Sequence, residues 1–458
     1  MLLVTRVMRF LRRFGLQLSL EPLLLLSLLL SSSIFAAGKA GREYRWETDS
    51  RSQSEFLTEI LKKPEMGREN LFHWPAIIST TVSNLVHMSE VKAQQYGFTK
   101  SIMINKEGFR TEYYSKLAKE GRPTVVFVGG LGSNLEMSAF YYYAVPLVVN
   151  QGWGVVMVEN GTSPEWIIRN DTLFFSGYQA GWNLYLFLQQ LKETYSEKIS
   201  ELHVVGISLG GNDAAHASYF DSLLHTNVVD GSFMAWSSPA HRLEGMKQMR
   251  TKPGFGNMLA RHILKPIYDQ AMPVFQKYTN KDFQWFMGGA HFQDVLKELF
   301  APPAYHYFIE HSHHFERGHL PDKKNPLGHV EEILNVEQYS KLFTLPPFWT
   351  QMKKPMLWIH SEDDPVVSPA VTVDYIKTQK QKSYVSSYLM PDGGHIGYVL
   401  SRGRPWVESF IVNYVKYWGK LPKAEYDQWK AVELCKVERS PKYPFLRKNV
   451  CRVTDAKW

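Results

Sequence analysis

The 458-residue sequence contains only two cysteines, Cys435 and Cys451. So few cysteines exclude a small scaffold held together by many disulfides, and they exclude a metal centre built from several thiolates. The two cysteines lie close together near the C-terminus, where one local disulfide is expected in an exported protein. Two free buried thiols are the alternative.

The sequence also lacks an apolar run of the length that usually crosses a membrane. Its most apolar segment, from Pro22 to Ala37, has roughly 16 residues, whereas a spanning helix needs ~20. Arginines precede this segment and small residues end it, which is the order of a secretory signal peptide. We therefore expect cleavage and a periplasmic or secreted protein. A membrane anchor formed by an uncleaved N-terminal segment is the alternative.

Signals for nucleotide or nucleic-acid binding are missing as well. The glycine-rich segment 129–132 is not followed by the Lys-Ser or Lys-Thr of a P-loop, and the spacing of a dinucleotide-binding fold is absent. The formal net charge of +8 is scattered, without a dense basic stripe interleaved with aromatic residues. We expect no nucleic-acid partner and no cofactor.

What the sequence does contain is the composition of a globular protein, with 44% hydrophobic and 21% charged residues. The pattern along the chain predicts one main core with additions. These parts are a signal peptide (1–37), an N-terminal extension (38–100), a core in two parts (101–238 and 353–421), a lid insertion (239–352) and a C-terminal tail with the expected disulfide (422–458).

From residue 101 onward, short apolar runs alternate with stretches of helical spacing. This alternation predicts an α/β fold with a mostly parallel central sheet, helices on both of its faces and an inserted helical lid. Because about 110 residues separate two of the strands, the intervening segment should carry structure of its own. The expected strands are 101–104 and a run through 113–114, forming a hairpin, then 124–128, 154–158, 202–205, 229–235, 356–360 and 384–389; the clearest helices are 181–193 and 211–224.

The main chemical signal is Gly206-Ile207-Ser208-Leu209-Gly210, placed between an expected strand and an expected helix. A sharp turn there would lift the Ser208 hydroxyl above the sheet, and side chains at the two glycine positions would clash with neighbouring backbone. The five-residue motif alone is common, and a glycine-rich structural turn is the alternative. In its strand–turn–helix context the motif indicates a nucleophilic serine.

A serine nucleophile needs a histidine base and a carboxylate that orients it, and both follow in the expected chain order. Asp363 and Asp364 come after the strand 356–360, and His395 lies in a glycine-rich loop after the last strand. An oxyanion formed on attack also needs backbone N–H donors. We expect them from Leu209, directly after the serine, and from Leu131 in the glycine-rich segment.

These motifs resemble the α/β-hydrolase superfamily and, within it, the YheT-like branch of abhydrolase-domain proteins. The resemblance covers roughly residues 101–421 without much of the lid, and it implies a serine hydrolase with Ser208, Asp364 and His395 as its triad. It favours Asp364 over Asp363 because the acid of the family falls three residues after the place held here by Ser361. It also implies substrates like those of esterases or lipases.

Two features depart from that family. Its members commonly have His-Gly where this chain has Gly129-Gly130, and an arginine-containing loop is replaced here by Val158–Thr162. These changes leave the triad untouched and put the details of the oxyanion loop and the substrate preference in doubt.

Two groups of residues in the expected lid allow other interpretations. Five histidines could form a transition-metal site, but no suitable cysteine or carboxylate spacing accompanies them, and a polar loop is the simpler interpretation. Six aromatic residues are expected to form the core of the lid, or in part an acyl pocket. The histidines are His311, His313, His314, His319 and His329, and the aromatics are Phe283, Trp285, Phe286, Tyr305, Tyr307 and Phe308.

The sequence therefore predicts an exported serine hydrolase that cleaves a carboxylic ester or related acyl bond through an acyl-enzyme. Its expected partner is a small-molecule or lipid acyl substrate, and peripheral contact with a membrane stays open. An acyltransferase using the same triad is one alternative function, and proteolysis like that of an aminopeptidase is another. A non-catalytic binding protein on a hydrolase fold is the third.

Overall fold

A computed structural model of the chain describes residues 46–48, 80, 88–118, 122–137, 139–171, 174, 177–242, 245, 269–273, 352–372, 376, 385–390, 392–399, 404–420, 436–439 and 447–450. The expected signal peptide, most of the expected lid with its histidines and aromatic residues, and both cysteines lie outside these residues. Within the described part, no helix has the length and hydropathy required to span a membrane.

The centre of the fold is a nine-stranded sheet with the order β1-β9-β8-β7-β6-β4-β5-β3-β2. The six strands from β4 to β9 run parallel to one another, whereas β1, β2 and β3 pair antiparallel with their neighbours. From β2 to β9 this is the strand order of the α/β-hydrolase fold, in which the second and fourth strands of that series are neighbours. The predicted fold class is therefore confirmed. The strands are β1 (Trp46–Thr48), β2 (Thr99–Ile104), β3 (Arg110–Lys116), β4 (Thr124–Val128), β5 (Gly154–Val158), β6 (Leu202–Ile207), β7 (Phe233–Trp236), β8 (Met356–Ser361) and β9 (Val385–Met390).

The bounds of β4 and β5 match the predicted ranges, and β2 with β3 form the predicted hairpin. The strand predicted over 229–235 begins later, at Phe233. The two residues Val228 and Val229 instead donate backbone N–H groups to the Asp221 carboxylate, at 2.7 and 3.3 Å, which ties them to the end of a helix. Strand β1, in the N-terminal extension, was not predicted.

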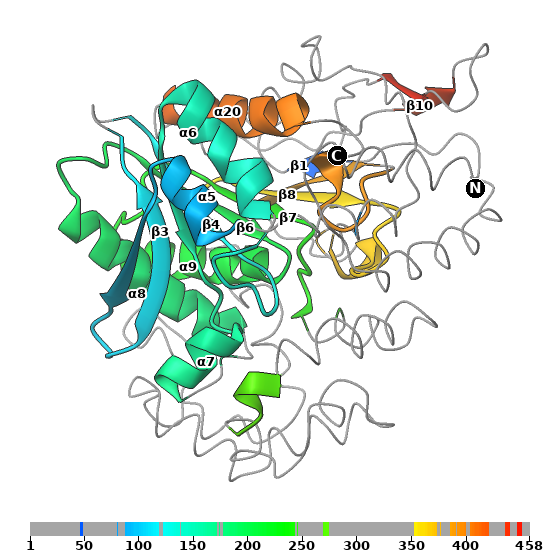
Figure 1. Cartoon of the computed structure of the whole chain (residues 1–458). Coiled ribbons are helices and arrows are strands. Elements are labelled where there is room, and N and C mark those ends of the chain that lie inside the picture. The colour runs from blue at the N-terminus through cyan, green and yellow to red at the C-terminus, as the bar shows by residue number, and fades with distance from the viewer. Residues whose placement is uncertain are drawn as a thin grey trace.

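Side chains alternate along the buried strands and divide the core into two layers. In β4, Val126 and Val128 belong to one hydrophobic cluster, while Val125 and Phe127 belong to the other. Such alternation follows from the two-residue period of a strand, and here both faces are buried because helices cover both. Figure 1 shows α8 and α9 on one face and α6 and α20 on the other.

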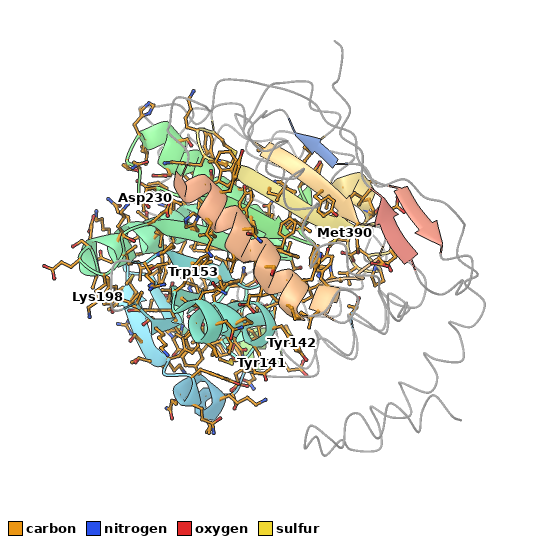
Figure 2. All side chains as sticks on the ribbon, turned by 90° about the horizontal axis from the view of Figure 1, so that it is seen from above. Tyr141, Tyr142, Trp153, Lys198, Asp230 and Met390 are labelled. Atoms are coloured by element: carbon orange, nitrogen blue, oxygen red, sulfur yellow. The ribbon has the colours of Figure 1, made fainter. Side chains whose placement is uncertain are left out.

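The helices have sequences suited to these positions. Helix α8 packs closely on α9, because Gly177 and Gly181 face Asn212 and His216 without room for a side chain of their own. Figure 2, viewed from above, shows α20 crossing the strands with α6 and the labelled Tyr141 and Tyr142 beside it. The helices are α5 (Glu90–Gln95), the π-helix η2 (Phe140–Ala144), α6 (Val145–Gln151), α7 (Pro164–Asn170), α8 (Gly177–Thr194), α9 (Leu209–Leu224), η4 (Asp269–Ala271), η7 (Pro369–Val371) and α20 (Arg404–Lys420).

Near the C-terminus, β10 (Lys436–Arg439) and β11 (Arg447–Val450) form a separate antiparallel pair, with Lys436 opposite Val450. In the sequence, Cys435 directly precedes β10 and Cys451 directly follows β11, and both lie outside the described residues. The disulfide between them therefore stays a prediction.

Candidate active site

Ser208 lies at the turn between β6 and α9, at the carboxyl end of the central parallel strands. Its backbone has φ 53° and ψ −126°, a conformation that a non-glycine residue adopts only under strain of about 1–3 kcal/mol. The turn requires glycine on both sides, because a Cβ at Gly206 would lie 2.3 Å from the Gly210 carbonyl oxygen. A Cβ at Gly210 would lie 2.4 Å from the carbonyl oxygen of Gly129. Both expected clashes with backbone are thus present.

The structure brings Ser208, His395 and Asp364 together in one hydrogen-bonded line. His395 Nε2 lies 2.9 Å from Ser208 Oγ, and His395 Nδ1 lies 2.9 Å from Asp364 Oδ2. Because an ionised carboxylate can only accept, Nδ1 carries the proton that faces Asp364. This leaves the Nε2 lone pair for the serine hydroxyl. Ser208 as a residue is half-buried.

Asp364 is buried, and both of its carboxylate oxygens accept hydrogen bonds. Oδ1 accepts the backbone N–H groups of Val366 and Val367 at 2.8 and 2.9 Å, and Oδ2 accepts from His395. Burial by itself raises the pKa of Asp364, but the charge of His395, its hydrogen bond and the nearby His360 outweigh burial and lower that pKa below its usual value. Asp364 is therefore ionised and suited to orient His395.

The neighbouring Asp363 points elsewhere. Its Oδ1 accepts the backbone N–H of Gly394 at 2.9 Å, so it caps the loop that carries His395 and does not contact the imidazole. Burial, with the charge of Asp392 adding to it, raises the pKa of Asp363 to about 7. The two adjacent aspartates thus point in different directions, as expected for adjacent side chains of a turn, and their pKa values shift in opposite senses.

The loop around His395 is held by side chains from distant parts of the chain. We call Gly394, His395 and Ile396 the histidine loop. Three of its backbone groups are N–H donors: that of Gly394 binds Asp363, that of His395 binds Thr80 Oγ1 at 2.8 Å, and that of Ile396 binds Ser237 Oγ at 3.3 Å. Its carbonyl oxygens at Gly394 and Ile396 accept from Ser361 Oγ at 2.7 Å and from the Tyr143 hydroxyl at 3.3 Å.

Four of these side chains were not predicted to hold the loop: Thr80, Tyr143, Ser237 and Ser361. Thr80 belongs to the N-terminal extension, in which the sequence showed no chemistry. Ser361 stands where the family that the sequence resembles usually has glycine. The unusual serine could have been a signal, because its hydroxyl supplies a hydrogen bond that glycine cannot. For Thr80 the sequence offers no signal.

The glycine-rich loop after β4 lies against Ser208. A Cβ at Gly130 would come within 2.7 Å of Ser208 Cβ and 3.2 Å of its Oγ, so only glycine fits there. The Gly130 carbonyl accepts the Ser133 N–H at 3.1 Å. In a trans peptide the C=O and the next N–H point in opposite directions, so the Leu131 N–H points away from Ser133.

The two expected oxyanion donors, Leu131 and Leu209, thus flank Ser208 in the chain segments next to it. Leu209 is the first residue of α9, where backbone N–H groups have no partner inside the helix. Within the described residues, neither N–H donates to a protein acceptor. This arrangement provides two N–H groups beside the serine that could bind a negative oxygen.

Within the described residues, no group of three or more His, Cys, Asp or Glu side chains could hold a metal ion. The histidines considered as a metal site lie outside these residues, as do the aromatic residues considered for an acyl pocket.

No model of a known protein family matches the chain. A curated protein of Synechocystis sp. (strain ATCC 27184 / PCC 6803 / Kazusa), "Putative esterase slr0264", is 31% identical over 67 residues. This match covers 15% of the present chain and 18% of the length of that protein, so the similarity is limited to one segment of each chain.

Solved structures with a similar course of the chain were also found. An esterase of Pyrococcus furiosus has a TM-score of 0.44 and 12% identity, covering 73% of this chain and 98% of its own. Est1E from Butyrivibrio proteoclasticus has a TM-score of 0.39 and 11% identity, covering 69% and 99%. An acylaminoacyl peptidase of Pyrococcus horikoshii has 0.41 and 13%, covering 77% and 45%. At such scores the fold assignment depends on the strand order described above.

Proposed function

We propose that this protein is a serine hydrolase that cleaves a carboxylic ester or a related acyl bond through a Ser208–His395–Asp364 triad. The observation that carries the proposal is the continuous hydrogen-bonded line from Asp364 through His395 to Ser208, with the serine on a strained turn. Ion pairs and buried histidines are common in proteins and do not by themselves indicate catalysis. A serine in this backbone conformation, at the end of a line of two 2.9 Å contacts, is the arrangement of a catalytic nucleophile with its base and acid.

In the first half of the reaction, His395 Nε2 takes the proton of Ser208 as Oγ attacks the carbonyl carbon of the substrate. Asp364, ionised and hydrogen-bonded to Nδ1, stabilises the imidazolium that forms. The carbonyl oxygen becomes negative and binds to the N–H groups of Leu131 and Leu209. Collapse of this intermediate breaks the bond to the leaving alcohol, which receives the proton from His395.

In the second half, water attacks the acyl group on Ser208 and gives its proton to His395. The acid is released, and the proton returns to Ser208. Transfer of the acyl group to another alcohol would use the same residues with that alcohol in place of water. The proportion of acid to transferred ester among the products distinguishes the two outcomes.

The proposed family branch and the proposed export of the protein depend on the sequence alone. The motifs around Ser208, Asp364 and His395 are similar to those of the YheT-like branch, and the leader at residues 1–37 favours export. The curated relative and the esterases among the structural neighbours support ester substrates in general. A small-molecule or lipid ester is therefore the proposed substrate class.

Covalent labelling tests the proposal directly. The full chain should react with a fluorophosphonate probe and hydrolyse p-nitrophenyl esters, with a dependence on acyl length that defines the pocket. Ser208→Ala should abolish labelling and lower kcat by several powers of ten, because the nucleophile is lost. A Ser208→Ala protein that hydrolyses these esters at the wild-type rate would overturn the proposal, and so would a folded wild-type protein that takes up no probe.

A further inference from the structure

Three buried polar side chains that take no part in the triad lie behind the segment Gly129–Gly132, which we call the oxyanion loop. They are Asn160, directly after β5, Asp213 in α9, and Arg242, after β7, with 1%, 2% and 0% of their surface exposed. Polar groups buried this deeply are unfavourable unless they are hydrogen-bonded. Their partners therefore indicate what they hold in place.

Asn160 connects the oxyanion loop to the helix that follows the serine. Its side-chain amide donates to the Gly129 carbonyl oxygen at 2.9 Å and to Asp213 Oδ2 at 2.8 Å. An amide NH₂ has two hydrogens, so both are used. Because the Gly129 carbonyl is also the backbone group that faces Gly210, this contact fixes the loop at the point where it meets the serine turn.

The other end of the oxyanion loop is fixed through Thr162. The Gly132 N–H donates to Thr162 Oγ1 at 3.0 Å, and the Thr162 hydroxyl and backbone N–H both donate to Asn160 Oδ1. Asn160 thus controls the first residue of the loop directly and the last residue through Thr162. The Leu131 N–H lies between these two anchors.

Asp213 and Arg242 keep the Asn160 amide in its orientation. Asp213 Oδ1 accepts from Arg242 Nη2 at 2.7 Å while Oδ2 accepts from Asn160. Burial raises the pKa of Asp213, and the charge of Arg242 and the hydrogen bonds from Asn160 and Arg242 oppose this rise. Without Arg242 the buried Asp213 would lose the counter-charge that favours its ionised form, in which both oxygens accept hydrogen bonds.

We propose that Asn160, Asp213 and Arg242 are positioning residues that set the distance between the two oxyanion donors. Asp213 belongs to α9, which begins with the Leu209 N–H, and Asn160 holds the loop that carries the Leu131 N–H. The three side chains therefore join the two donors into one rigid unit. This inference rests on the function proposed above.

The segment that carries Arg242 is itself fixed to the core. The N–H groups of Ala240 and His241 donate to the Val371 carbonyl at 2.8 and 3.1 Å, which ties the start of the predicted insertion to η7. Arg242 therefore approaches Asp213 from an anchored backbone. This rigidity suits a residue that positions others.

Enzyme kinetics of Asn160→Ala test the inference. The variant should lower kcat roughly 10- to 100-fold, because misplaced oxyanion donors stabilise the transition state less, while KM stays within about threefold. Butylboronic acid supplies a second measurement, since Ser208 adds to boron and forms an anionic tetrahedral adduct that resembles the intermediate. Its inhibition constant should rise by a factor similar to the loss in kcat/KM.

A matched control separates positioning from general destabilisation. Asn105 is also a buried asparagine, and it lies in the turn between β2 and β3. Its Nδ2 donates to Asn183 Oδ1 at 2.8 Å and its Oδ1 accepts the N–H groups of Glu107 and Phe109, so Asn105→Ala removes comparable hydrogen bonds in another part of the fold. That variant should lower the melting temperature but leave kcat and boronate inhibition at wild-type values. An Asn160→Ala enzyme with unchanged kcat and unchanged boronate inhibition would overturn the inference while leaving the proposed function intact.

A second pair of variants keeps the inference testable if Asn160→Ala does not fold. Thr162→Val removes the hydroxyl that accepts the Gly132 N–H and donates to Asn160 Oδ1, whereas Thr162→Ser keeps it. The valine variant should lose kcat and boronate affinity in parallel, and the serine variant should recover most of both. Equal behaviour of the two would contradict the inference. A wild-type protein that neither hydrolyses esters nor reacts with a fluorophosphonate would instead refute the proposed function itself.

Discussion

The serine turn and the histidine loop reach the same site by different means. The conformation of Ser208 is imposed by residues next to it in the sequence, since Gly206 and Gly210 are needed for the turn and β6 and α9 flank it. The histidine loop is held by five side chains that lie 31 to 315 positions away in the sequence. The residues that shape the turn around the nucleophile are therefore mostly local in the sequence, with a distant contact only at Gly210, whereas the position of the base depends on contacts from across the fold.

The largest effect on kcat is expected when the hydrogen bond between Asp364 and His395 is altered. Asp364→Asn keeps the shape of the side chain but no longer forces the proton onto Nδ1 of His395, so kcat should fall about 10⁴-fold. Asp363→Asn is the matched control, because the Asn oxygen can still accept the Gly394 N–H, and its kcat should stay within about tenfold of wild type. Steady-state kinetics of both folded variants decide the assignment, and the opposite ranking would give the role to Asp363.

A side chain at Gly210 should disrupt the serine turn, because it would clash with the backbone of a neighbouring segment. In Gly210→Ala the new Cβ would lie 2.4 Å from the Gly129 carbonyl oxygen and 2.5 Å from that of Val128, so β4 and the turn must move apart. We expect a loss of about 3 kcal/mol in the free energy of unfolding, measured with denaturant.

Gly152→Ala is the control for that glycine. Its φ is +64°, but its Cβ would have nothing within 4 Å, so only the backbone conformation is penalised, by about 1 kcal/mol. Equal losses in the two variants would mean that the close approach of the turn to β4 has no energetic weight.

A smaller effect on catalysis is expected from the most distant contact of the histidine loop, the one made by Thr80. Thr80→Val removes the acceptor of the His395 N–H, a contact worth about 1 kcal/mol, so kcat/KM should fall roughly fivefold. Thr80→Ser keeps the hydroxyl and should stay near wild type. If valine and serine behave alike in ester hydrolysis, the N-terminal extension does not help to hold the base.

The sequence predicts the local features of this structure, whereas it does not predict the contacts between distant segments. The strands β4 and β5, the serine turn and the order of Ser208, Asp364 and His395 are visible in local patterns of apolar residues and glycine. Thr80 and β1 were missed, because their roles depend on which distant segments meet, and periodicity carries no information about that.

The cluster behind the oxyanion loop was missed for the same reason. Asn160 lies in a segment that the sequence marks only as a departure from related proteins, and Arg242 falls in the predicted lid. Only the fold brings both side chains to Asp213.

The smallest effect concerns pH and the turn that supports the histidine loop. Burial, with the charges of Asp392 and Asp364 adding to it, raises the pKa of Asp363 from its ordinary value of 3.8 to about 7. The folded state therefore binds more protons than the unfolded state between these values, and the stabilisation present at low pH is lost as pH rises through about 7.

Asp363→Asn cannot ionise, so its melting temperature should fall less between pH 5 and pH 8 than that of the wild type. Thermal unfolding at several pH values measures the difference. Parallel curves for the two proteins would show that Asp363 does not titrate in this range.

The hydrogen bond between Thr80 and His395 joins residues 315 positions apart. Contacts with so large a sequence separation close last and slowly, because the chain must first give up the entropy of a very long loop. The serine turn needs no such closure and can form with its own strand and helix. During refolding, helical circular dichroism should therefore return before ester hydrolysis does, and enzyme activity would report the final step of folding.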